Sequence, residues 1–332
     1  MRTIQPSKAK EEMAANAKAG IATMLWGPPG TGKSNIAYQF LDSLGASIYE
    51  LRANLFDPVD VRGGLKVVEQ ENGTYKTRYG IPEDYPPSDG EGIFGLVIDE
   101  LPNAPKATQN ALLQLILDRK IGTYELPKNT IIIAAGNRAE DRAAVHEMPT
   151  PAKNRFAHYV LEPSIDDWAA WAANNDIDES VIAFLRYRPA LLSAMDATQN
   201  AFPTPRTWSM VSKKLPFMTD MFYGTASLVG DGPAGEYVAF RAVYKDVPDF
   251  DKLIKSPSTT KVPTDPSVLY AIASGLATRA HPAVFKPIMK YAKRMPMEYQ
   301  VVIVKDSLAK DPTLAAETCF TDWTELNAEI LM

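Results

Sequence analysis

The sequence contains very little cysteine and histidine and has no long apolar run. Its only cysteine among 332 residues is Cys319, so neither a disulfide within the chain nor a cysteine-based zinc site can form. The three histidines, His146, His158 and His281, share no metal-ligand spacing. No stretch approaches the roughly 18 apolar residues of a membrane span. These absences predict a cytoplasmic protein with no membrane partner and no metal other than Mg²⁺.

An excess of positive charge is also missing. The sequence has 35 Lys and Arg against 40 Asp and Glu, which gives a formal net charge of -5 at pH 7. Nucleic-acid phosphates are bound by cationic surfaces, so this balance disfavours a nucleic-acid partner but leaves a local basic channel open. The remaining composition is that of an ordinary globular protein, with 45% hydrophobic and 23% charged residues.

A glycine-rich segment follows a short apolar run near the N-terminus. Residues 27–34 read Gly-Pro-Pro-Gly-Thr-Gly-Lys-Ser and match the phosphate-binding loop G-x-x-x-x-G-K-[ST] at every fixed position. Residues 21–26 fit a buried strand, and apolar residues after the loop recur at helical spacing, which is the context that the motif requires. The predicted nucleotide-binding residues are Gly27, Pro28, Pro29, Gly30, Thr31, Gly32, Lys33, Ser34 and Asn35.

These residue types suit ATP and Mg²⁺. Glycines let successive backbone N–H groups and a helix N-terminus converge on one anion. Lys33 is expected to reach the β- and γ-phosphates, and the Ser34 hydroxyl is expected to hold Mg²⁺.

Two carboxylates directly follow a second apolar run. Residues 93–98 predict a buried strand, and Asp99 and Glu100 come next. A P-loop ATPase holds Mg²⁺ and orients the attacking water at such a strand end, so we predict Asp99 as a metal residue and Glu100 as the residue that polarises water. The predicted strand 130–135 leads to Asn137, whose amide would lie beside the γ-phosphate, since ligands of parallel sheets bind at the carboxyl ends of strands.

Local patterns predict further elements around these motifs. Residues 7–19 favour a helix that Gly20 ends, and residues 47–51 alternate as a strand does. Proline and paired glycines predict irregular backbone over 57–64. Residues 65–79 have Asn-Gly at their centre and predict a β-hairpin with an exposed polar tip.

The motifs together resemble those of the AAA+ ATPases over about residues 20–215. They occur in the family's order: Gly27 to Ser34, the segment ending in Asp99-Glu100, Ala135-Gly136-Asn137, Asn154-Arg155-Phe156 and Thr204-Pro205-Arg206. Residues 57–64 followed by a hairpin are similar to the MoxR branch. By this resemblance Asn137 is the sensor 1 residue, Arg155 the arginine finger offered to a neighbouring subunit, and Arg206 the sensor 2 arginine. The hairpin would be the insert that points into the pore of a ring.

The residues alone leave alternatives for these arginines. Arg155 could form an ordinary surface ion pair. Arg138 stands where many MoxR proteins have proline, and Arg142 lies nearby, so either could share the finger role. Arg206 follows a Thr-Pro pattern that is typical of a helix start, where a cation opposes the helix dipole and therefore suggests an anionic partner.

The predicted fold class is α/β. We expect a P-loop (AAA+) αβα core with a parallel sheet at residues 1–160, an all-helical lid at 161–222 and a helical C-terminal extension at 223–332. The resemblance implies Mg²⁺-dependent ATP hydrolysis in a homo-oligomeric ring, commonly a hexamer. It further implies remodelling, maturation or activation of a client protein, which for MoxR proteins often involves a partner with a von Willebrand factor A domain.

Three other functions share parts of this pattern. A nucleic-acid motor or loader would use the same ATPase core but needs a basic stripe. A small-molecule kinase shares the phosphate-binding loop but does not need Glu100 beside Asp99 together with an arginine finger. A module that binds nucleotide only for stability would not need Glu100. The observations that separate them are salt-dependent DNA binding and ATP turnover without an acceptor.

Overall fold

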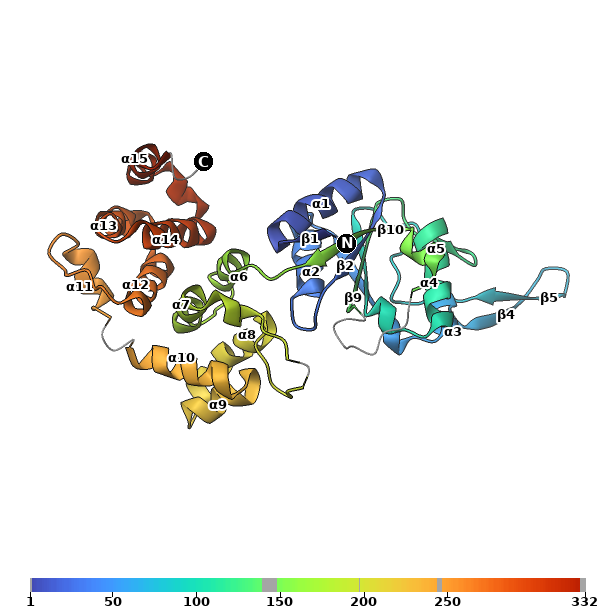
Figure 1. Cartoon of the computed structure of the whole chain (residues 1–332). Coiled ribbons are helices and arrows are strands. Elements are labelled where there is room, and N and C mark those ends of the chain that lie inside the picture. Colours follow the sequence, from blue (N-terminus) through green and yellow to red (C-terminus); the bar gives the residue numbers. More distant parts are fainter. Residues whose placement is uncertain (1, 139–147, 197, 244–246, 329–332) are drawn as a thin grey trace. The chain divides into compact units, whose positions relative to one another are not determined.

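The structure, a computed structural model, describes residues 2–138, 148–196, 198–243 and 247–328 (Figure 1). The chain divides into two compact units, Met1–Glu162 (unit 1) and Pro163–Met332 (unit 2). Unit 1 contains β1 (Arg2–Ile4), α1 (Pro6–Ala19), β2 (Ala22–Trp26), α2 (Lys33–Ser43), β3 (Ser47–Arg52), η1 (Ala53–Leu55), α3 (Pro58–Arg62), β4 (Leu65–Glu69), β5 (Tyr75–Tyr79), β6 (Phe94–Asp99), η2 (Leu101–Asn103), α4 (Lys106–Asp118), β7 (Lys120–Ile121), β8 (Tyr124–Glu125), β9 (Thr130–Gly136), α5 (Thr150–Lys153) and β10 (Phe156–Leu161).

A six-stranded parallel sheet forms the centre of unit 1, in the order β1-β10-β2-β9-β6-β3. The predicted strands before the phosphate-binding loop, before Asp99 and before Asn137 are confirmed as β2, β6 and β9. They are the three central strands between β10 and β3. Their carboxyl ends therefore meet at one edge, where ligands of parallel sheets bind.

Helices cover both faces of this sheet, as the predicted αβα core requires. Alternate strand residues point to opposite faces. Leu25, Val97 and Ile133 pack against α1 and α2, whereas Met24, Leu96 and Ile132 belong to the core on the side of α4. Burial on both faces explains why these strands are continuous apolar runs in the sequence.

Residues 57–64 differ from the predicted irregular backbone, because a short helix, α3, begins inside this segment. The Asp57 side chain accepts a hydrogen bond from the backbone of the third helical residue, and the Asp60 carboxylate accepts the Asp57 N–H at 2.8 Å. This capping box, with Pro58 at the first helical position, stabilises a helix start. The paired glycines then end the helix after Arg62.

The predicted hairpin is confirmed as β4 and β5, which pair with each other as a separate two-stranded sheet. Its turn is longer than a two-residue Asn-Gly turn. The Gly73 N–H donates to the Gln70 carbonyl at 2.9 Å, so Glu71 and Asn72 are the central turn residues. Gly73 follows them with a φ of 76°, a left-handed conformation that favours glycine.

The regular elements of unit 2 are all helices within its described residues. Its elements are α6 (Ile165–Ala172), α7 (Glu179–Tyr187), η4 (Pro189–Leu192), α8 (Pro205–Lys214), η5 (Leu215–Phe217), α9 (Met221–Val229), α10 (Asp231–Val243), α11 (Phe250–Lys255), α12 (Pro266–Arg279), α13 (Pro282–Ala292), α14 (Met297–Lys310), η7 (Pro312–Ala316) and α15 (Thr318–Leu326). The predicted boundary at residue 222 falls inside α9, and the division into lid and extension stays a prediction. Within the described ranges, no helix is long and apolar enough to cross a membrane.

A buried ion-pair network joins three helices of unit 2. Arg186 of α7 forms ion pairs with Asp306 of α14 and with Asp166 of α6. Burial opposes the charged guanidinium, but the two carboxylates still raise the pKa of Arg186. Lys305 extends the network at the surface, with 3.2 Å between its Nζ and Asp166.

Candidate functional site: the carboxyl end of the parallel sheet

The phosphate-binding loop connects β2 to α2 through backbone that only glycine adopts readily. Gly30 and Gly32 have φ values of 79° and 89°, in the left-handed region. Gly32 caps α2, and its carbonyl accepts the Ile36 N–H at 2.9 Å. The first N–H groups of a helix have no partners within the helix, so this helix start is suited to an anion such as phosphate.

Lys33 is buried at the start of α2 and brings the loop and β9 together. Its Nζ donates to the carbonyls of Gly27 and Pro28 at 2.8 and 2.9 Å. It also donates to Asn137 Oδ1 at 2.9 Å, across 104 residues of sequence. The Gly27 N–H donates to the Gly136 carbonyl at 3.3 Å, which ties the loop to the same strand end.

Ser34 and Asp99 meet at the neighbouring strand end. The Ser34 hydroxyl donates to Asp99 Oδ2 at 2.6 Å. One hydroxyl and one carboxylate thus lie side by side, and oxygen ligands of this kind are what Mg²⁺ prefers. Together with substrate phosphates, they fit a Mg²⁺ site.

Glu100 stands at the end of β6 in a conformation that is uncommon for a residue with a side chain. Its φ is 54° and its ψ is 31°, in the left-handed region. The Asp99 carboxylate accepts the Glu100 N–H at 2.8 Å, and the Glu100 carbonyl accepts the Asn103 N–H at 2.9 Å. Such backbone costs of the order of 1–3 kcal/mol and clusters at functional sites. Here it leaves the Glu100 side chain exposed beside Asp99.

Tyr38 on α2 is influenced by two nearby carboxylates, those of Glu50 and Asp99. Burial raises the pKa of the Tyr38 phenol on α2, and the carboxylates of Glu50 and Asp99 raise it further. Tyr38 therefore stays neutral and adds no negative charge of its own. Glu50 is paired with Arg52, with 3.0 Å between Arg52 Nε and Glu50 Oε1, so Asp99 supplies the negative charge beside Ser34.

Arg155 lies in a turn between α5 and β10. Its side chain is exposed and forms no ion pair among the described residues, so the alternative of a surface ion pair is not observed there. Within the described part of the chain, the Arg155 side chain forms no hydrogen bond with Lys33 or Asp99. Arg142 and His146 lie outside the described residues.

The turn that carries Arg155 is tied to the phosphate-binding strand through His158, a residue that the sequence reasoning missed. Trp26 Nε1–H donates to His158 Nδ1 at 2.9 Å, and the two rings stack with centroids 5.9 Å apart. His158 Nε2 lies 2.6 Å from the Lys153 carbonyl. Because the indole only donates and the carbonyl only accepts, we assign the imidazole proton to Nε2. Only the pairing of β10 with β2 brings these residues together, and no local pattern predicts it.

Arg206 belongs to unit 2, in the first turn of α8. The predicted helix start is confirmed, since Thr204 Oγ1 accepts the Thr207 N–H at 3.1 Å and Pro205 follows as the first helical residue. Trp208 is buried and donates to the Leu191 carbonyl at 2.6 Å, which anchors the helix. Arg206 itself is exposed, and its role as sensor 2 stays a prediction.

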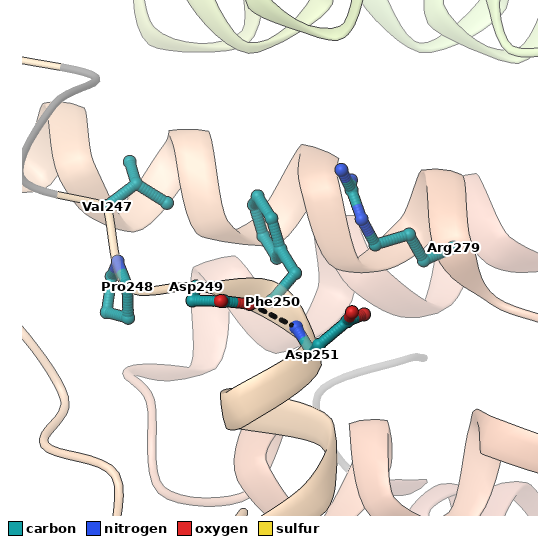
Figure 2. A pocket seen from close by; sticks show the side chains of 6 residues that line it. All are labelled: Val247, Pro248, Asp249, Phe250, Asp251 and Arg279. Atoms are coloured by element: carbon teal, nitrogen blue, oxygen red, sulfur yellow. Dashed lines mark hydrogen bonds between the residues drawn. The ribbon is translucent and has the colours of Figure 1, made fainter.

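A pocket of about 330 Å³ lies elsewhere, in unit 2 (Figure 2). Two of its charged groups are engaged in the fold: Asp249 caps α11 by accepting the Asp251 N–H at 2.8 Å, and Arg279 lies over the Phe250 ring. Arg279 Nη1 also donates to Glu179 at 2.6 Å. None of the predicted site residues lines this pocket.

Residues 22–156 match the family described as AAA domain (dynein-related subfamily). This segment is similar to an AAA domain. No curated protein matches the sequence. The predicted α/β P-loop fold with a helical C-terminal region is thus confirmed.

The solved structures that match share little sequence with this chain. The Thermotoga maritima RuvB Holliday junction branch migration motor is 16% identical with a TM-score of 0.40, covering 86% of this chain and 85% of its own. NtrX from Brucella abortus in complex with ADP is 12% identical with a TM-score of 0.41, covering 97% of this chain and 67% of its own. At these identities and TM-scores neither structure assigns an activity to this chain.

Proposed function

We propose that the chain is a MoxR-like AAA+ ATPase that couples ATP hydrolysis in a ring to remodelling, maturation or activation of a client protein. One observation carries the proposal. Side chains from three separate elements meet at the carboxyl end of the sheet, where Lys33 contacts Asn137 and Ser34 contacts Asp99. Glu100 follows Asp99 directly and is exposed.

Each of these residues has a part in ATP hydrolysis. Lys33 and the first N–H groups of α2 bind the phosphates of ATP. Ser34 and Asp99 would hold Mg²⁺, which would neutralise charge on the phosphates of ATP. The Glu100 carboxylate orients the attacking water, and the Asn137 amide aligns that water with the γ-phosphate.

The remaining charge of the transition state is met from a second copy of the chain. The exposed Arg155 guanidinium has no ion pair among the described residues, so it is available to a neighbouring subunit. Arginine fingers of this kind stabilise transferring phosphoryl groups. Arg206 of unit 2 is the proposed sensor 2 residue. A hexameric ring would supply one Arg155 to each site.

The client would engage the β4–β5 hairpin at the ring's pore. Its strands are exposed along their whole length and extend away from the rest of unit 1 (Figure 1). A protein with a von Willebrand factor A domain is the class of partner that the MoxR resemblance favours.

The most direct test of client coupling uses Glu100→Gln as a trap. This variant should bind ATP without hydrolysing it, and a client should co-purify with it in ATP but not in ADP. Lys33→Ala is the matched control, because it removes nucleotide binding. Recovery of the same proteins with Lys33→Ala, or in ADP, contradicts the proposal. Recovery of nucleic acid instead of protein supports the motor alternative.

A further inference from the structure

The two faces of the β4–β5 hairpin differ sharply in chemistry. Strand residues alternate between faces, and the register places Leu65 opposite Tyr79 and Lys66 opposite Arg78. One face, which we call the apolar face, carries Leu65, Val67, Glu69, Tyr75, Thr77 and Tyr79. The other, which we call the basic face, carries Lys66, Val68, Lys76 and Arg78.

The apolar face is open to solvent. Leu65, Val67 and Tyr75 are 64%, 71% and 68% exposed. An exposed cluster of large apolar side chains on a folded protein marks an interaction site. The hairpin therefore has a surface that a partner could cover.

The basic face holds three cations and no carboxylate. Among the described residues, Lys66, Lys76 and Arg78 form no ion pair. Lys66 and Arg78 lie directly opposite each other, and like charges in that position destabilise a strand pair. This arrangement occurs in a chain with a net charge of -5. An anionic partner would remove the repulsion.

Both edges of the hairpin can accept another strand. The Gly80 N–H donates to Gly64 at 2.8 Å and the Gln70 N–H donates to Thr74 at 2.7 Å, so the even-numbered residues of β4 form the hydrogen-bonded pairs. The backbone groups of Leu65, Val67 and Glu69 consequently point outward. Such an edge is a template for an extended peptide.

We propose that the hairpin binds an extended acidic segment of a protein client, which adds to it as a third strand. Alternate side chains of an added strand point to opposite faces, so acidic residues meet the basic face and apolar residues meet the apolar face. This inference deepens the proposed function and rests on it for the identity of the ligand as a client. Nucleic acid satisfies only the basic face, since it offers neither a strand edge nor aliphatic side chains.

The test measures binding of a fluorescent ten-residue peptide of alternating Glu and Val to the full-length protein by anisotropy. The peptide should bind with an affinity that falls as salt rises. A Lys-Val alternating peptide and a peptide with Glu and Val in separate blocks should bind at least about tenfold more weakly. Equal binding of either control peptide overturns the proposal, as does failure of the Glu-Val peptide to bind.

Matched variants locate the site. Lys66→Glu with Lys76→Glu should weaken peptide binding at least about tenfold, whereas Lys252→Glu with Lys255→Glu, an exposed lysine pair on α11, should not. Val67→Ser with Tyr75→Ser tests the apolar face and should also weaken binding. Thermal unfolding checks that each variant is folded. Unchanged affinity in the folded hairpin variants contradicts the assignment.

Single-stranded DNA is the competing ligand in the same assay. If DNA displaces the peptide and binds more tightly at equal salt, the hairpin is a nucleic-acid element and the proposal is wrong. Peptide binding requires no hydrolysis. Lost peptide binding with intact ATP turnover therefore refutes only this inference, and absent ATP turnover with intact peptide binding refutes only the proposed ATPase function.

Discussion

At the scale of single residues, Lys33 and Glu100 carry different parts of the proposed chemistry. Lys33→Ala removes the buried ammonium that faces the phosphate site, so nucleotide binding should be lost. Glu100→Gln keeps the phosphate contacts and should retain ATP affinity within a few-fold while turnover falls at least about 100-fold. Nucleotide titration and phosphate release measure the two effects. Near-normal hydrolysis by Glu100→Gln refutes its assignment.

A second prediction at this scale concerns stability. Asp306→Ala leaves Arg186 buried without its main partner, and breaking such a pair costs about 3–5 kcal/mol. Lys305→Ala on the same helix removes only a half-exposed partner and should cost less than about 1 kcal/mol. Urea unfolding followed by tryptophan fluorescence gives both free energies of unfolding. An equally small loss for the two variants would contradict the claim that Asp306→Ala leaves a buried, unpaired Arg186.

Many site residues could be predicted because their patterns are local. The phosphate-binding loop specifies Lys33 and Ser34 by spacing, and an apolar run ending in two carboxylates specifies Asp99 and Glu100. The contact of Lys33 with Asn137 needs the parallel strands β2 and β9 to lie side by side, which the sequence patterns do not specify. The hydrogen bonds of His158 could not be predicted, because they depend on which strand lies beside β2.

At the scale of elements, His158 connects β2 to the turn that carries Arg155. His158→Phe keeps an aromatic ring beside Trp26 but removes both hydrogen bonds. The turn should then hold Arg155 less accurately, so ATP turnover should fall by roughly 10- to 100-fold with little change in nucleotide affinity. Tyr159→Phe on the same strand is the control. It loses only the hydrogen bonds of the Tyr159 hydroxyl to α1. Equal turnover in the two variants contradicts a positioning role.

Strands buried on both faces were the easiest elements to predict. β2, β6 and β9 are continuous apolar runs, and their burial against helices on each face explains that pattern. β1 is only three residues long, and the middle of β10, residues 157–159, is only partly buried. Their pairing is long-range, so the sequence patterns did not reveal them.

At the scale of the whole molecule, composition and motif order predicted the fold class but not the packing of the helical unit. The helices of unit 2 form two buried clusters, one involving α6 to α10 and one involving α11 to α15. Helical periodicity predicts that such faces are buried but not which helices they contact. The division of unit 2 into a lid and an extension therefore remains a prediction.

The central claim is that each ATP site is completed by two copies of the chain. Arg155→Ala alone should reduce turnover about 1000-fold or more, and Glu100→Gln alone should be inactive. A mixed ring places the intact Glu100 of one variant beside the intact Arg155 of the other. The decisive measurement is ATP turnover as the two variants are mixed, with ring formation checked by light scattering. The account predicts that activity reappears and is highest near equal amounts, whereas mixed rings that form and stay inactive would contradict it.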